Sequence, residues 1–254
     1  MLFRSDVVGL AAAWLAAGLG TRSPTGQYTY GLRRASILAA LANAIILLVV
    51  TGGIGWAAIE RLIAPEPTEG GAIIAVAVAG IVVNGITALL FMRGRGQDLN
   101  VRAAFMHMAA DASLAAGVAI AGAIILLTGW LRVDPAVSLV ISVVIVMMTW
   151  DLLRDSVNLS LDAVPPGIDQ EQVSRYLCSL PGVVEVHDLH IWGMSTTETA
   201  LTAHLVRTDS RDDDDLLHRI CHEVREHFNI CHATVQLETP EHAHACELRP
   251  DHVV

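Results

Sequence analysis

The chain has 254 residues, of which 53% are hydrophobic and 17% are charged. So apolar a composition is typical of transmembrane helices and unusual for a soluble domain. The formal net charge of −10 argues against a nucleic-acid partner, because nucleic acids attract basic surfaces. The sequence contains neither a nucleophile–base arrangement nor a phosphate-binding loop, so an enzyme is the least expected class. Four cysteines without Cys-X-X-Cys spacing indicate neither a disulfide framework nor a zinc ribbon.

Charge divides the chain in two. Residues 1–163 contain as many Arg as Asp plus Glu. Residues 164–254 carry the whole net charge, all four Cys and ten of the eleven His. We therefore expect a transmembrane domain over residues 1–163 and an acidic, histidine-rich domain over residues 164–254.

Four apolar stretches reach or approach the roughly 20 residues that a membrane-spanning helix needs. They are Ala35–Ala58, Gly71–Met92, Ala103–Leu131 and Pro135–Trp150. A fifth, Val7–Gly20, is too short to span a membrane alone. Arginines concentrate in segments 21–34 and 93–102, and basic loops stay in the cytoplasm. By the same alternation the chain leaves the membrane on the cytoplasmic side after Trp150, so the acidic domain is expected there.

The periodicity changes after Pro165. Helices are expected over 169–180 and 210–228, and strands over 182–194, 199–208 and 231–239. The helices have apolar residues at helical spacing, with Ser210 or Asp212 as a cap of the second, and the strands alternate and are β-branched. The order α-β-β-α-β predicts a small two-layer α+β domain. The tail over 240–254 has no periodicity.

Two ionisable residues interrupt the third long apolar stretch. His107 and Asp111 are four residues apart, so on a helix they share one face. An ionisable group in the membrane marks function by default, because burying it unpaired in hydrocarbon costs several kcal/mol. An imidazole and a carboxylate suit a divalent metal such as zinc. The alternative is a hydrogen-bonded pair that only holds helices together.

Several segments together resemble one transporter family. They are SDVVGLAAAWLA, PTGQYTYGLRRASILAALANA, LNVRAAFMHMAADA, DPAVSLVIS and VHDLHIW. In this order they are similar to the cation diffusion facilitator family of zinc-type metal/proton antiporters. The resemblance implies six transmembrane helices, a cytoplasmic ferredoxin-like α-β-β-α-β domain and a homodimer. It also implies efflux of Zn²⁺, with Cd²⁺ or Co²⁺ as further cargo, in exchange for protons across the inner cell membrane, where the protein is multi-pass and surrounded by lipid.

The resemblance also implies a transport site. The family takes two ligands from its second helix and two from its fifth, each pair four residues apart. The fifth-helix pair matches His107 and Asp111, and the downstream second-helix ligand matches Asp6. The upstream ligand would fall at Leu2, and the family's first helix is missing. We therefore expect an N-terminally truncated reading frame in which Met1–Ser5 are an artefact.

This departure has two readings. One is a degenerate, truncated paralogue, and the other is a damaged reading frame of a transporter whose natural chain begins upstream. For the function, the alternative to a transporter is a non-transporting, membrane-anchored protein that binds metal or regulates.

The resemblance further implies a metal site in the cytoplasmic domain. His187, His204 and Glu238 match that site, and Zn²⁺ bound there would act as a regulator. Cys231 is expected near this group. Because His204 and Glu238 alternate away from their apolar neighbours, they can ligate side by side. A second candidate is the tail cluster His242, His244 and Cys246, as a flexible metal trap.

A charged pair is the last candidate feature. Related proteins lock their dimer near the base of the third family helix and beneath the sixth, where this chain has Arg34 and Asp162. The two residues are thus predicted to form a charge interlock. The alternative is two solvated charges at the membrane surface.

Overall fold

The computed structural model describes residues 18–20, 23–65, 70–92, 99–208, 213–243, 246 and 248, and over 99–110 the side chain of Met108 alone. The chain divides into two compact units, residues 1–46 with 150–254 and residues 47–149. Within the described residues, four helices are long and apolar enough to cross a membrane. They are α2 (Ala35–Ile63), α3 (Gly70–Met92), α4 (Leu99–Thr128) and α5 (Val133–Ser160).

These helices lie where the apolar stretches predicted them, but three run further at one end. Helix α2 continues to Ile63, α4 begins at Leu99 rather than Ala103, and α5 continues to Ser160 rather than ending at Trp150. Hydropathy marks the length that lies in lipid, whereas backbone hydrogen bonds carry a helix onward as long as no breaker intervenes. Of the predicted stretch Val7–Gly20, only residues 18–20 are described, and they are helical.

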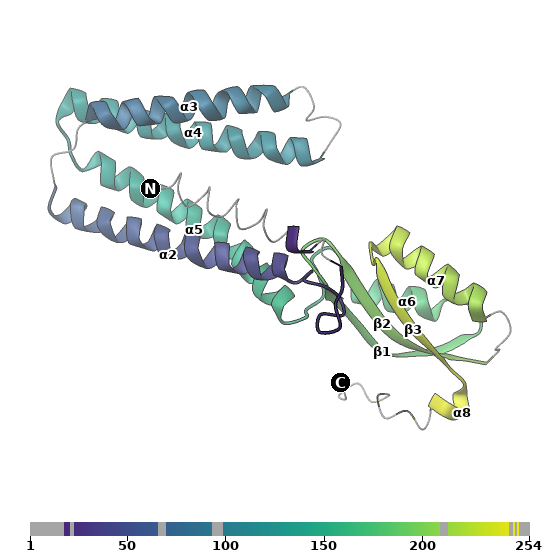
Figure 1. Ribbon diagram of the computed structural model, residues 1–254. Helices are drawn as coiled ribbons and strands as arrows, with labels where there is room; N and C mark the ends of the chain where they lie inside the picture. Colours follow the sequence, from purple (N-terminus) through teal and green to yellow (C-terminus); the bar gives the residue numbers. More distant parts are fainter. Residues whose placement is uncertain are drawn as a thin grey trace. The chain divides into compact units, whose positions relative to one another are not determined.

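Small residues bring α3 and α4 together as antiparallel neighbours (Figure 1). A Cβ added at Gly122 would lie 2.8 Å from Ile74 Cγ1 and 3.2 Å from the carbonyl oxygen of Gly70. A Cβ added at Gly80 would lie 3.4 Å from Ala115 Cβ. Without a hydrophobic force between helices in lipid, close backbone approach of this kind provides the packing energy.

The cytoplasmic domain has the predicted order α-β-β-α-β, with one extra helical turn. Its elements are α6 (Gln170–Cys178), β1 (Val183–Gly193), β2 (Thr199–Arg207), α7 (Asp213–Phe228), β3 (His232–Glu238) and α8 (Pro240–Ala243). The sheet order is β1-β2-β3, with β1 antiparallel and β3 parallel to β2. The fold class predicted from the sequence is confirmed.

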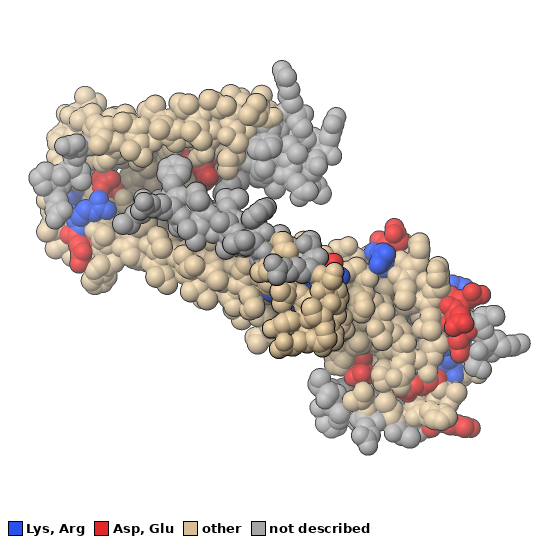
Figure 2. Space-filling model, in the orientation of Figure 1, with Lys and Arg blue, Asp and Glu red and all other residues tan. Residues whose placement is uncertain are grey.

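Local chemistry stabilises the starts of the two longer helices of this domain, α6 and α7. Asp169 caps α6 by accepting hydrogen bonds from the backbone N–H of Glu171 and Gln172, at 2.9 and 3.3 Å. Helix α7 begins with three consecutive Asp residues, which suit the positive end of the helix dipole. The predicted caps Ser210 and Asp212 lie outside the described residues. Carboxylates gather over this domain, whereas α3 and α4 show almost only uncharged surface (Figure 2).

The two faces of the sheet have different roles. Leu201, Ala203 and Leu205 of β2 are buried among α6 and α7, which cover one face (Figure 1). Strand alternation turns His204 to the opposite face, which α6 and α7 do not cover and which we call the helix-free face. Helix α8 packs against β2 and lies at the end of β3, away from α6 and α7 (Figure 1). The helix-free face and the tail that follows β3 therefore meet beside His204.

Candidate metal centre

The membrane candidates are only partly described. Helix α4 runs without a break through positions 107 and 111, so His107 and Asp111 do share one helix face, one turn apart. Asp111 is half-buried. The side chain of His107 and the whole of Asp6 lie outside the described residues. A common site of the three therefore remains a prediction.

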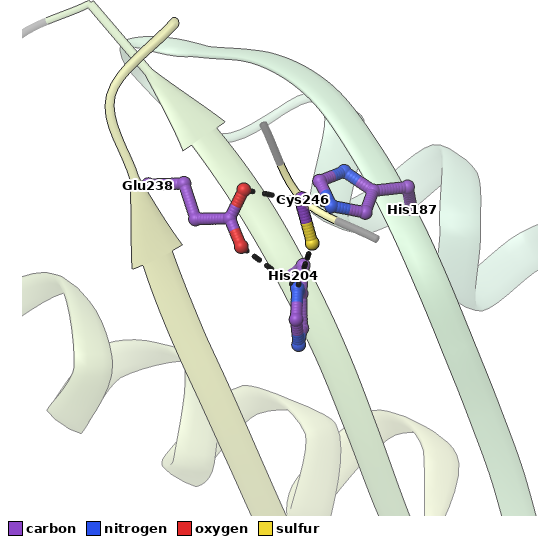
Figure 3. Close-up of side chains that lie close together, drawn as sticks. All are labelled: His187, His204, Glu238 and Cys246. Carbon is purple, nitrogen blue, oxygen red and sulfur yellow. Dashed lines mark hydrogen bonds and ion pairs between the residues drawn. The ribbon is translucent and has the colours of Figure 1, made fainter. Parts of the chain in front are cut away.

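In the cytoplasmic domain, three strands and the tail bring four possible ligands together (Figure 3). His187 on β1 is the direct cross-strand partner of His204 on β2, and Glu238 ends the neighbouring strand β3. Cys246 follows α8. One nitrogen, oxygen or sulfur atom from each residue lies within 4.8 Å of those of the other three.

The contacts identify which atoms face the common point. His204 Nδ1 is 2.8 Å from Glu238 Oε1 and 3.7 Å from Cys246 Sγ. His187 Nε2 is 3.5 Å from Glu238 Oε2, which is too long for a good hydrogen bond. The four side chains thus converge, and His204 is paired with Glu238 Oε1, but His187 and Glu238 Oε2 are left without a close partner.

Burial makes this incomplete pairing costly. The side chains of His187 and Glu238 are 3% and 5% exposed. Among the described residues, neither ring nitrogen of His187 nor Oε2 of Glu238 has a hydrogen-bond partner. A buried polar atom left unpaired costs about 1–3 kcal/mol. Two imidazoles, a carboxylate and a thiol are a ligand set that suits tetrahedral Zn²⁺, so a bound cation would satisfy these atoms.

A fifth polar residue contacts this group from its far side. Asp188 Oδ2 is 3.5 Å from His204 Nε2, the ring nitrogen that faces away from Glu238, and Asp188 Oδ1 is 2.8 Å from His190 Nε2. Asp188 has φ +50° and lies where the β1–β2 register shifts between His187 and His190. This β-bulge turns the carboxylate toward His204.

Other sequence predictions fare differently. Cys231 is not near the group: its Sγ lies 3.3 Å from the carbonyl oxygen of Thr199, at the end of the sheet opposite Glu238. Of the predicted tail cluster, Cys246 lies beside His204, and the cluster itself remains a prediction. His242 Nδ1 instead lies 2.9 Å from Thr239 Oγ1, and His244 lies outside the described residues.

The approach of Cys246 was missed, although the sequence contains a signal for it. Thr239 followed by Pro240 is a helix-start pattern, and it begins the turn of α8 that reverses the chain after β3.

The predicted charge pair is present. Arg34 and Asp162 form an ion pair, with their side chains 50% and 51% exposed. Next to it, Arg33 pairs with Glu198 at 2.7 Å, and the Thr196 N–H donates to Ser36 Oγ at 3.2 Å. Pairs this exposed contribute little stability each. The two charges are thus paired but still solvated, and their role as an interlock remains a prediction.

Membrane-spanning helices are followed by a domain in which His, Glu and Cys side chains converge. This combination is typical of a membrane protein that binds or transports a divalent metal. Family models agree with this class. The one described as "Cation efflux transmembrane domain" matches residues 3–159, and the one described as "Cation efflux protein, cytoplasmic domain" matches residues 165–240. The chain belongs to the cation efflux, or cation diffusion facilitator, family.

Individual relatives cover most of the chain. The zinc transporter ZitB of Escherichia coli is 39% identical over 247 residues, 96% of this chain and 79% of the relative. The metal cation efflux system protein CzcD of Cupriavidus metallidurans is 35% identical, over 92% of this chain and 74% of the relative. The cadmium, cobalt and zinc/H(+)-K(+) antiporter of Bacillus subtilis is 30% identical, over 94% of this chain and 78% of the relative.

Among solved structures, the metal-bound C-terminal domain of CzcD matches 28% of this chain and 99% of that domain, with 32% identity and a TM-score of 0.26.

These comparisons confirm the predicted family and class. The protein is a multi-pass membrane transporter with a cytoplasmic C-terminal domain, and it is not an enzyme.

Proposed function

We propose that the protein exports Zn²⁺ from the cytoplasm in exchange for protons, with Cd²⁺ and Co²⁺ as further cargo. The observation that carries this proposal is the similarity over 96% of the chain to a zinc transporter. The relative named as a cadmium, cobalt and zinc/H(+)-K(+) antiporter supports both the range of metals and the use of protons.

We assign the transport site to Asp6, His107 and Asp111. The support is the continuous helix through positions 107 and 111 and the cost of placing ionisable groups in hydrocarbon without a role. Metal and protons compete for these ligands, because a carboxylate must be ionised and an imidazole neutral to coordinate. Releasing protons on loading and regaining them on unloading couples the two fluxes. The small-residue seam between α3 and α4 suits helices that shift against one another.

Transport in proteoliposomes tests this function. With the protein expressed from its genomic gene and reconstituted, and with the lumen acidified, external Zn²⁺ should enter and brighten a trapped zinc dye. A protonophore should stop the uptake, because it removes the proton gradient. Zinc binding without any gradient-dependent uptake would reject the antiporter and favour the membrane-anchored metal-binding protein, since both share the cytoplasmic group.

We also propose that residues 164–254 form the cytoplasmic domain after a transmembrane domain over 1–163, and that His187, His204 and Glu238 bind Zn²⁺ there as a regulator. The unpartnered buried atoms of His187 and Glu238 support the metal site. A regulatory ion at a site separate from the cargo lets cytoplasmic zinc adjust export.

The Arg34–Asp162 pair is proposed as an interlock of a homodimer. Because both side chains are about half exposed, removing either should cost less than about 1 kcal/mol of a protomer's own stability. Reversing the charge at position 34 alone, with Arg34→Asp, should instead lower the fraction of dimer measured by mass photometry in detergent. The swap Arg34→Asp/Asp162→Arg should restore it. A normal dimer fraction in the single variant would reject the interlock.

A further inference from the structure

We propose that Cys246 is the fourth ligand of the cytoplasmic metal site, so that metal binding fastens the C-terminal tail onto the helix-free face of the sheet. This inference rests on the metal site proposed for His187, His204 and Glu238. It adds a thiolate from the chain that follows α8 to that site.

The tail is already held beside the site. Helix α8 packs on β2, Ala243 is 2% exposed, and the Cys246 N–H donates to the carbonyl oxygen of Ala243 at 3.3 Å. Val206, which strand alternation places on the same helix-free face as His204, is also 2% exposed. The turn at α8 therefore delivers the thiol to His204 from a part of the chain that the strands do not fix.

The geometry leaves a place for the sulfur. Two imidazoles and one carboxylate fill three positions of a tetrahedral Zn²⁺ ion, and ligand atoms around such an ion lie about 3.3–3.8 Å apart. Cys246 Sγ is 3.7 Å from His204 Nδ1, and no pair of candidate atoms in the group exceeds 4.8 Å. Small side-chain rotations bring all four atoms to coordination distance.

Thiolate ligation has a measurable consequence. Coordination consumes the thiolate, which is the form that reacts with alkylating reagents. The other cysteines serve as internal controls, because Cys178 and Cys221 are exposed on α6 and α7. Metal should therefore protect Cys246 alone.

The experiment is residue-resolved alkylation of the full chain in detergent, with N-ethylmaleimide and mass spectrometry of the peptides. At free zinc about ten times the dissociation constant, Cys246 should react about tenfold more slowly, because only the remaining open sites react. Cys178 and Cys221 should react at unchanged rates. His204→Ala should abolish the protection, whereas the matched tail variant His242→Ala should leave it intact.

The outcomes separate this inference from the site on which it rests. If Cys246 reacts equally fast with and without zinc, while zinc still raises the melting temperature of the cytoplasmic domain, Cys246 is not a ligand and the three-residue site stands. If zinc changes neither, both are wrong.

A different observation, the left-handed backbone of Asp188, points to a positioning residue. We infer that Asp188 orients His204 as a metal ligand. A non-glycine residue in this region of backbone space costs on the order of 1–3 kcal/mol, and Asp188 adopts φ +50°. Its side chain is 11% exposed and contacts two histidines, so the bulge holds a carboxylate where regular alternation would not place one.

Asp188 contacts the ring nitrogen of His204 that does not face the metal site. His204 Nδ1 faces Glu238 and Cys246, and its other nitrogen faces Asp188 Oδ2 at 3.5 Å. That distance is longer than a good hydrogen bond, and a small rotation of either side chain closes it. A carboxylate on the far nitrogen of a ligating imidazole fixes its tautomer and ring orientation, and losing it lowers metal affinity about 10–100-fold. Asp188 therefore acts through His204 rather than on the metal.

Two substitutions at Asp188 separate positioning from structure. Both Asp188→Asn and Asp188→Gly should raise the zinc concentration that half-protects Cys246, or half-saturates the melting shift, by about 10–100-fold. Glycine tolerates the left-handed conformation, so Asp188→Gly should not lower the melting temperature of the metal-free protein. His190→Ala removes the other partner of Asp188 and should leave zinc affinity within about twofold of wild type, because the contact between Asp188 and His204 is retained. Unchanged zinc affinity in Asp188→Gly would reject the positioning role.

Discussion

Replacing His107 or Asp111 by alanine is expected to abolish zinc export. Both residues lie on one face of α4, one turn apart, in a segment where ionisable side chains are expensive. A tetrahedral site that loses one of its few ligands binds Zn²⁺ too weakly to load. Each variant also loses a group that takes up and releases protons with the metal, so the coupling to the proton gradient fails at the same step.

The measurement is zinc resistance in a bacterium that lacks its own zinc exporters, with the protein expressed from its genomic gene. His107→Ala and Asp111→Ala should grow no better than cells with an empty vector. Asp155→Ala is a matched control, because Asp155 is an exposed carboxylate on α5, and it should retain wild-type resistance. Full resistance in either α4 variant, at equal protein levels, would remove that residue from the transport site.

Much of the fold follows from local sequence patterns. Long apolar runs specify the spanning helices because their length must match the hydrocarbon thickness. The spacing of apolar residues in α7 and β2 predicts a helix and a strand in the cytoplasmic domain, because one face of each must be buried. The end of α5 at Ser160 does not follow from hydropathy, since a helix that leaves lipid continues into water without a change of backbone.

The candidate site shows a sharper limit. His204 and Glu238 are predictable from strand alternation, which turns both away from the core. Alternation would place Asp188 on the face opposite His187, yet the bulge brings both to His204. Cys246 depends on a chain reversal at α8 and on the burial of Ala243. Periodicity specifies neither a bulge nor a reversal, and the Thr239–Pro240 signal marks only where the turn of α8 starts. The positions of Cys246 and Asp188 beside His204 therefore come from the three-dimensional structure.

Zinc is expected to raise the melting temperature of the isolated cytoplasmic domain. Residues 164–254 should fold without the membrane helices, because the core around Leu177, Leu205 and Ile220 lies entirely within them. Zinc at 100 times its dissociation constant should stabilise this fragment by about 2.7 kcal/mol. For a domain of this size that shift in free energy raises the melting temperature by roughly 10–20 °C. Adding a chelator should reverse it, and acid should weaken it because protons compete for the histidine nitrogens.

The double variant His187→Ala/His204→Ala should lose this zinc-induced shift, as measured by calorimetry with and without zinc. Its metal-free form should still fold, since His187 contributes two buried nitrogens that have no partner within the described residues. The matched control is His218→Ala/His222→Ala, which removes two exposed histidines one turn apart on α7 and should keep the full shift.

Glu238→Ala should lower zinc affinity without unfolding the domain, because Glu238 ends its strand outside the apolar core. A shift that survives in the His187→Ala/His204→Ala variant would show that zinc binds elsewhere, and His242, His244 and Cys246 in the tail would become the better candidates.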